Sequence, residues 1–114
     1  MTRQLNPAQH FHITISGKGA HAARPHEGID VIVIGSHIIS ALYALPGRSH
    51  TLGITRLSAG NSWNVLPHTA EIDGIWSGQT EQAPAQITAL ISGIAAGFGA
   101  QTAVDWRPTN ASTA

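Results

Sequence analysis

Four stretches of the chain alternate between apolar and polar residues with the period of two that is typical of half-buried β-strands. They occupy residues 10–17, 51–58, 69–77 and 102–107. Because alternate side chains of a strand point to opposite faces of a sheet, each stretch predicts one buried and one polar face. The side chains expected on the buried face are Phe11, Ile13, Ile15, Leu52, Ile54, Ala70, Ile72, Gly74, Trp76, Val104 and Trp106.

Two longer stretches have the spacing of α-helices. The first begins at Asp30, a favourable N-cap residue, and ends before Pro46 and Gly47, which do not continue a helix. Nearly its whole circumference is apolar, since Ile34, Ile38 and Leu42 form one stripe and Val33, Ile39 and Tyr43 lie largely outside it. The second helix opens around residues 80–84 and has one apolar face, formed by Ile87, Leu90, Ile91, Ile94 and Phe98.

The elements therefore follow the order β-α-β-β-α-β. Right-handed crossovers then place both helices on one face of a four-stranded antiparallel sheet, the ferredoxin-like α+β sandwich. A chain of 114 residues suits one domain. We expect that domain at residues 10–107, between a flexible N-terminal segment, residues 1–9, and a frayed tail, residues 108–114. In this topology the second and fourth strands are the edges of the sheet.

The first helix and the second strand both need a further cover. A helix that is apolar all round is covered on a second side, and in so small a domain another subunit is the simplest cover. The second strand, residues 51–58, has only Arg56 to protect its edge from pairing. We therefore expect a homodimer that joins these two elements, with His37 as a polar contact inside the interface. The predicted interface residues are Ile34, Ile38, Ile39, Leu42, Leu52 and Ile54.

Composition narrows the classes of partner. The formal net charge is zero and the pI is about 7.1, so the chain lacks the basic surface expected of a protein that binds nucleic acid or an anionic membrane. It contains no cysteine, which excludes disulfides and thiolate metal sites. Its longest apolar run, in residues 31–35, is too short to span a bilayer. We expect a soluble, cytoplasmic protein with no nucleic-acid or membrane partner.

Polar chemistry is concentrated in one connection, "GKGAHAARPHEGID", residues 17–30. Its glycines let the backbone bend sharply and Pro25 stiffens the return, so the loop is either an ordinary turn or presents His21 to a ligand. His26 could serve the turn or ligate a metal, but two histidines five residues apart do not form a metal site without further ligands. The acidic residues of the chain are scattered, and His10 and His12 are expected to be ordinary surface positions.

A second motif, "SAGNSWNVLPHTAEIDG", follows about forty residues later, at residues 58–74. Together the two motifs resemble the dimerisation (lid) domain of the zinc-dependent aminoacylase and carboxypeptidase metallopeptidases. The resemblance is to the amidohydrolase branch, which contains hippurate hydrolases and N-acyl amino acid amidohydrolases. It covers residues 10–107 and implies the same β-α-β-β-α-β fold and a homodimer.

The resemblance also implies roles for individual residues. His21 would reach the active site of the partner subunit and contact the scissile carbonyl or its oxyanion. Asn64 would be a second contact to the substrate, in a substrate-binding turn shaped by Gly60 and Pro67. Two zinc or similar divalent ions would lie in a catalytic domain that this chain lacks, so no cofactor is expected here. One position departs from the family, because Ser77 stands where an arginine usually clamps the substrate carboxylate, and serine cannot form that bidentate pair.

These observations predict the isolated dimerisation domain of a metal-dependent amidohydrolase that hydrolyses N-acyl amino acids or related amides. By itself this domain would be inactive, because a two-metal hydrolase needs bridging carboxylates and further ligands. The alternative is a free-standing ferredoxin-like homodimer that binds a small ligand or acts as an interaction module. That alternative explains the frame and the apolar helix but not the joint presence of the two motifs.

Overall fold

The computed structural model describes residues 8–21, 23–45, 51–78 and 83–108. None of the helices in this part of the chain is long and apolar enough to cross a lipid bilayer. The elements are β1 (Gln9–Ser16), β2 (Ala20–His21), the short 3₁₀-helix η1 (Pro25–Glu27), α1 (Val31–Tyr43), β3 (Thr51–Ala59), β4 (Val65–Leu66), β5 (Thr69–Ser77), α2 (Ala83–Gly97) and β6 (Gln101–Pro108).

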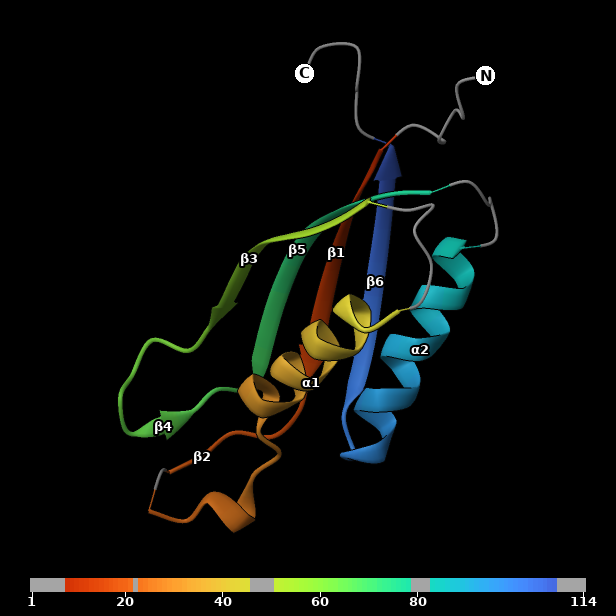
Figure 1. Cartoon of the computed structure of the whole chain (residues 1–114). Coiled ribbons are helices and arrows are strands. Elements are labelled where there is room, and N and C mark those ends of the chain that lie inside the picture. Colours follow the sequence, from red (N-terminus) through yellow and green to blue (C-terminus); the bar gives the residue numbers. More distant parts are fainter. Residues whose placement is uncertain (1–7, 22, 46–50, 79–82, 109–114) are drawn as a thin grey trace, which may run out of the picture.

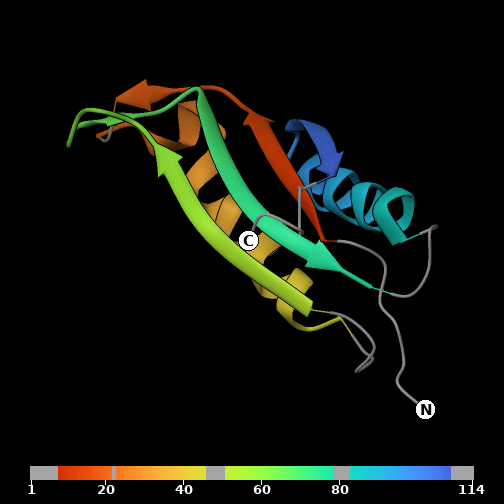
Figure 2. The ribbon, with the colours of Figure 1, turned by 90° about the horizontal axis from the view of Figure 1, so that it is seen from above.

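The main sheet has the strand order β3-β5-β1-β6, and all neighbouring strands are antiparallel. Both helices cover the same face, with α1 over β1, β3 and β5 and α2 beside β6 (Figures 1 and 2). This confirms the predicted α+β order β-α-β-β-α-β and the edge positions of β3 and β6. Strands β1 and β6 each extend one residue beyond the predicted limits, 10–107, and most of the two terminal segments expected to be flexible lies outside the described residues.

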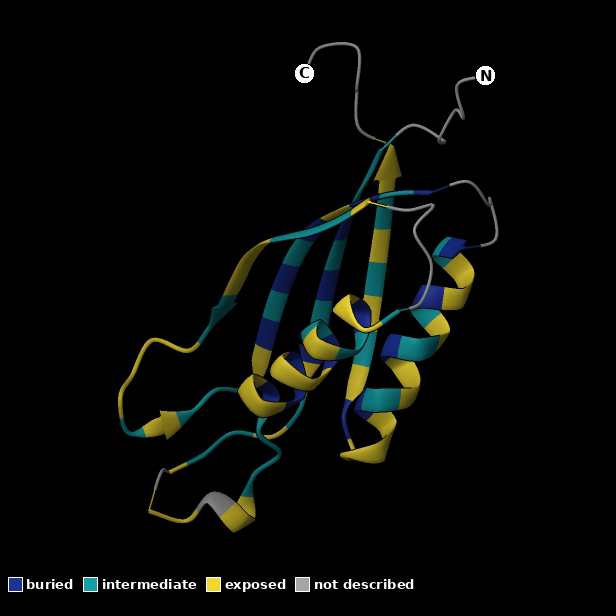
Figure 3. Cartoon of the chain, viewed as in Figure 1, coloured by how far each residue is buried: buried dark blue, intermediate teal, exposed yellow. Residues whose placement is uncertain are grey.

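The core lies between the sheet and the two helices, where the buried residues gather (Figure 3). Phe11, Ile13 and Ile15 of β1 point into it and are at most 1% exposed, as their alternation predicts. The ring of Phe11 fills the space above Gly74, on the paired strand β5, so that a Cβ atom there would overlap the ring. On its other side Phe11 contacts the ring of Trp106, with centroids 5.3 Å apart.

Helix α1 begins where the sequence predicts. The Asp30 carboxylate accepts hydrogen bonds from the backbone N–H groups of Ile32, at 3.0 Å, and Val33, at 3.2 Å. These bonds satisfy two of the four N–H groups that a helix leaves unpaired at its start. The predicted stop at Pro46 and Gly47 lies outside the described residues.

The structure corrects the interface expected on α1. Ile34, Ile38 and Leu42 are at most 1% exposed, because this stripe faces the sheet and forms the core of its own chain. Their side chains therefore have no surface left for a partner. The apolar residues that α1 leaves exposed are Ile32 and Val33, each 42%, and Tyr43, 57%, while Ile39 is half-buried.

Strand β3 contains a β-bulge at Thr55. Before the bulge Leu52 and Ile54 oppose Trp76 and Gly74, and after it Leu57 opposes Ile72. The apolar side chains thus change from even to odd positions and still face the helices. The Thr55 hydroxyl donates a hydrogen bond of 3.2 Å to the backbone carbonyl oxygen of Asp73 on β5.

Candidate functional site

Strands β2 and β4 form a small two-stranded extension beyond one end of the main sheet (Figure 1). In this antiparallel pair His21 lies opposite Val65 and Ala20 opposite Leu66. Asn64 immediately precedes Val65 in the chain. The extension therefore brings the backbone of His21 next to the segment of Asn64, although the two residues are 43 positions apart in sequence.

Three glycines make the loop of His21 compact. A Cβ atom at Gly17 would lie 2.7 Å from a methyl carbon of Val31, and one at Gly28 would lie 2.7 Å from the carbonyl oxygen of Lys18. At Gly19 it would lie 2.6 Å from the carbonyl oxygen of Leu66. All three distances are shorter than a side chain tolerates. The backbone of the loop is thus packed against α1, against itself and against β4.

His21 carries a hydrogen bond that defines its tautomer. Its Nδ1 accepts a bond of 3.0 Å from the backbone N–H of Ala23. Because Nδ1 is the acceptor, a neutral ring has its hydrogen on Nε2. The side chain is exposed, and its free nitrogen is a hydrogen-bond donor.

Asn64 is held in a comparable way. The Ser62 hydroxyl donates to Oδ1 of Asn64 at 2.7 Å, and the backbone N–H of Asn64 donates to Oγ of Ser62 at 3.4 Å. The carboxamide oxygen is thus occupied, and the amide nitrogen of Asn64 remains available as a donor. Each of the two side chains therefore has an N–H group that can donate a hydrogen bond.

The other expected site residues lie in different places. Gly60 precedes β4 with a positive φ of 74°, a conformation that favours glycine, and a Cβ atom there would lie 3.6 Å from Cγ of Pro67. Ser77 is the last residue of β5, whereas Thr69, the first, adjoins the extension. The length of that strand separates Ser77 from the extension of its own chain by roughly 25 Å.

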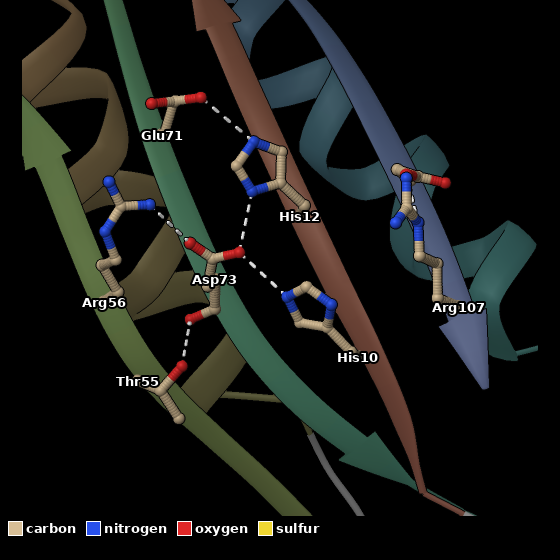
Figure 4. A network of polar contacts seen from close by, with 8 residues as sticks. His10, His12, Thr55, Arg56, Glu71, Asp73 and Arg107 are labelled. Atoms are coloured by element: carbon tan, nitrogen blue, oxygen red, sulfur yellow. Dashed lines mark hydrogen bonds and ion pairs between the residues drawn. The ribbon is translucent and has the colours of Figure 1, made fainter. Parts of the chain in front are cut away.

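A second polar cluster lies on the open face of the sheet, away from the helices (Figure 4). The Asp73 carboxylate accepts hydrogen bonds from Nε2 of His10, at 2.9 Å, and Nδ1 of His12, at 2.7 Å, and from Nη1 of Arg56, at 3.0 Å. Nε2 of His12 donates to Glu71 at 3.2 Å. His10 and His12 are therefore not the ordinary surface positions that the sequence suggested.

The geometry of this cluster requires that the His12 ring be charged. Both ring nitrogens of His12 face carboxylates, so both donate only when the ring is protonated. The hydrogen bond to Asp73, followed by the charges of Asp73 and Glu71, raises the pKa of His12 above its ordinary value. The same bond, with those from His10 and Arg56, holds the pKa of Asp73 well below its usual range. The cluster is a network of ion pairs that links β1, β3 and β5.

The described residues do not fit a metal ion. Among residues 8–21, 23–45, 51–78 and 83–108, no three histidine, aspartate or glutamate side chains are arranged to hold one. His26 lies exposed on η1, where Arg24 and Glu27 form an ion pair of 3.7 Å. No chemical step through a metal is therefore assigned to these residues.

Comparison with known proteins assigns this fold and its two motifs to a family. Residues 8–103 match the family model described as the peptidase dimerisation domain of M20 peptidases. The chain belongs to this family of dimerisation domains, as the two motifs predicted.

The relatives are deacetylases and peptidases that are much longer than this chain. It is 40% identical over 108 residues to the N-acetylcysteine deacetylase of Bacillus subtilis, covering 86% of this chain and 28% of that protein. It is 31% identical to the N-acetyldiaminopimelate deacetylase of Halalkalibacterium halodurans, covering 82% and 28%. The crystal structure of B. subtilis YxeP, described as a dinuclear metal-binding peptidase of the M20 family, superposes with a TM-score of 0.71 at 35% identity. The superposition covers 90% of this chain and 26% of YxeP. The chain thus spans about a quarter of these relatives.

Proposed function

We propose that this chain is the dimerisation domain of a metal-dependent amidohydrolase that hydrolyses N-acyl amino acids or related amides. The observation that carries the proposal is the pairing of β2 with β4, which places His21 beside the segment of Asn64. The deacetylase relatives and the share of their length that the chain covers support it. A separate catalytic domain would hold two zinc or similar ions, which would supply the activated water.

The two side chains suit the oxygen of an amide that is being hydrolysed. Attack of water on the carbonyl carbon moves negative charge onto the carbonyl oxygen, and fixed N–H donors stabilise that charge. Nε2 of His21 and Nδ2 of Asn64 are such donors, because Ala23 and Ser62 occupy the other polar atom of each side chain. In this proposal the extension of one subunit serves the active site of its partner. The chain alone is inactive.

The surface for the partner is the side of α1 that continues into β3. Ile39 follows Ile32 by seven residues, and Tyr43 follows Ile39 by four, so all three share this side of the helix. This side of α1 faces the edge of β3, because the Tyr43 hydroxyl accepts a hydrogen bond of 3.0 Å from the backbone N–H of Ile54 on β3. We propose that these three residues and the edge of β3 form the homodimer interface, with Leu52 and Ile54 on its inner border.

The opposite side of α1 belongs to the chain itself. The ring of His37 contacts the ring of Phe98, beside the end of α2, with centroids 5.1 Å apart. His37 therefore contacts its own chain and does not lie on the proposed interface. Val33, one turn before His37, shares this side.

Ile32 and Val33 allow a matched test of the dimer. Both are 42% exposed, but they lie on different sides of α1. In sedimentation velocity, Ile32→Asp should shift the dimer toward monomer at concentrations where the wild-type chain and Val33→Asp remain dimeric. Equal dissociation by the two variants would contradict the proposed interface.

The catalytic proposal is tested in a full-length amidohydrolase that carries this domain. His21→Ala should lower kcat for an N-acetyl amino acid by about 100-fold, as loss of one oxyanion donor does, without dissociating the dimer. His26→Ala is the control, because His26 lies exposed on the same loop outside the β2–β4 pair. Unchanged turnover in His21→Ala would remove His21 from the mechanism.

A further inference from the structure

His68 joins the two segments that form the extension. It lies between β4 and β5, and it holds the loop of His21 through two separate bonds. Its backbone carbonyl oxygen accepts a hydrogen bond of 2.8 Å from the N–H of Gly17. Its ring nitrogen Nδ1 accepts a bond of 3.2 Å from the N–H of Gly19.

The ring of His68 also packs against the backbone that it binds. A Cβ atom at Gly19 would lie 3.2 Å from Cε1 and 3.3 Å from Nδ1 of this ring. A side chain at Gly19 would therefore crowd the imidazole, although its closest contact would be the carbonyl oxygen of Leu66, at 2.6 Å. The contact and the hydrogen bond are made at Gly19, which directly precedes β2, a strand only two residues long that ends at His21.

We propose that His68 is a positioning residue for His21, which it holds in place only while its ring is neutral. The proposal that His21 then serves catalysis rests on the proposed function. The reason for the neutral ring is chemical: a protonated imidazole has N–H groups at both nitrogens and cannot accept a bond from Gly19. The backbone of His21 is otherwise held by the β2–β4 pair and by the hydrogen bond of 2.8 Å that its carbonyl oxygen accepts from the N–H of Arg24. Loss of the bond at Gly19 would therefore loosen the entry to β2, two residues before His21.

Acid should therefore loosen the loop. Glu27 pairs with Arg24, and Asp30 caps α1. Among the described residues none forms an ion pair with His68. The titratable or charged side chains on the neighbouring segments are Lys18, His21, Arg24, His26, Glu27 and Asp30. A proton on Nδ1 of His21 would break only the bond of that ring with the N–H of Ala23, so the readout for His68 is the amide of Gly19.

NMR of the 15N-labelled 114-residue chain tests the proposal directly. In an acid titration, ring spectra of His68 should show the neutral tautomer with hydrogen on Nε2 at the alkaline end and the protonated ring at the acid end. Over this range the amide resonance of Gly19 should move toward that of a free amide, together with the resonance of His21. Gly17 is an internal control, because its N–H is bound to the backbone of His68 and not to its ring.

Two substitutions separate the ring bond from general packing. His68→Ala removes the acceptor and should raise the exchange rate of the Gly19 amide about fivefold relative to Gly17 at neutral pH. His68→Asn places a carboxamide oxygen near the position of Nδ1, and this acceptor does not titrate. The variant should therefore retain protection at Gly19 and abolish the acid-induced shift of the Gly19 amide.

Several results would overturn the proposal. One is a Gly19 amide that ignores both pH and the alanine substitution. Another is an asparagine variant that behaves like the alanine variant while Gly17 stays protected. These readouts do not involve catalysis. If His21→Ala left turnover unchanged in the full-length enzyme while Gly19 responded as expected, the proposed function would fail and the positioning of the loop would stand.

Discussion

The hydroxyl oxygen of Tyr43, in the last turn of α1, accepts a hydrogen bond from the backbone N–H of Ile54 on the edge strand β3. Edge strands present unpaired N–H and C=O groups that other chains can bind. A side chain of the same molecule thus occupies one of these groups. The bond also ties the end of α1 to the border of the sheet, where we propose that the partner docks.

Tyr43→Phe tests this bond. The substitution should accelerate hydrogen exchange at the Ile54 amide and lower the free energy of unfolding by about 0.5 kcal/mol, because a partly exposed hydrogen bond contributes little net stability. Exchange should be measured at a concentration where the chain is monomeric, so that a partner strand does not cover the amide. Unchanged protection of Ile54 would show that the phenol is not its acceptor in solution.

Asp73 should be the most important charged residue for stability on the open face of the sheet. Asp73→Asn removes the carboxylate that accepts from His10, His12 and Arg56, and urea unfolding at pH 6 should show a loss of about 1–2 kcal/mol. Asp105→Asn is the matched control. Asp105 forms an exposed ion pair of 2.9 Å with Arg107, and its loss should cost less than about 0.5 kcal/mol.

The same network predicts how stability depends on pH. The raised pKa of His12 means that its contribution is complete below the unfolded value, about 6.5, and is lost as pH rises through the higher folded value. The lowered pKa of Asp73 means that its contribution is present above the unfolded value, about 3.8, and is lost as pH falls through the lower folded value.

The network should therefore contribute most between about pH 4 and pH 6.5. Urea unfolding measured across this range and up to about pH 9 should show a loss on the alkaline side that His12→Gln flattens. An identical alkaline slope in His12→Gln would assign the loss to other groups.

Glycine substitutions should separate the extension from the rest of the fold. Gly19→Ala places a Cβ atom 2.6 Å from the carbonyl oxygen of Leu66, and it should break the β2–β4 pair and destabilise the chain by about 1–3 kcal/mol. Thermal unfolding and the amide spectra of Ala20 and His21 would measure this.

Gly93 on α2 provides the control, because a Cβ atom there meets nothing within 4 Å. Gly93→Ala should stabilise the chain by about 0.5–1 kcal/mol, since alanine favours the helix. Equal effects of the two substitutions would contradict the tight packing at Gly19.

Local patterns were sufficient for most of the fold. Alternation in β1 and β5 identified their buried faces, and the Asp30 cap identified the start of α1. The side of α1 that is left open to a partner was harder to predict, because an apolar circumference does not say which stripe faces the sheet. Ile34, Ile38 and Leu42 went to the core, and the exposed positions became visible only with the sheet in place.

The polar cluster was missed for a different reason. His10 and His12 alternate on one strand, and Glu71 and Asp73 alternate on another about 60 residues away. Only the register that pairs His12 with Asp73 brings them together, and a single sequence contains no direct signal for that register. The pairing of His21 with Val65 depended on long-range contacts in the same way, although the two motifs had already indicated a shared site.

The bulge at Thr55 adds one residue to β3 relative to its paired strand β5. Leu52, Ile54, Leu57 and Ala59 would all fall on alternate positions if Thr55 were deleted, and the strand would regain an unbroken ladder with its apolar side chains on the same face. The shortened strand would fold, but it would have a straighter border that is easier for foreign strands to extend. The bulge thus divides the exposed edge of β3 into two short segments. Two copies of the chain that pair along this edge would have to align around the bulge.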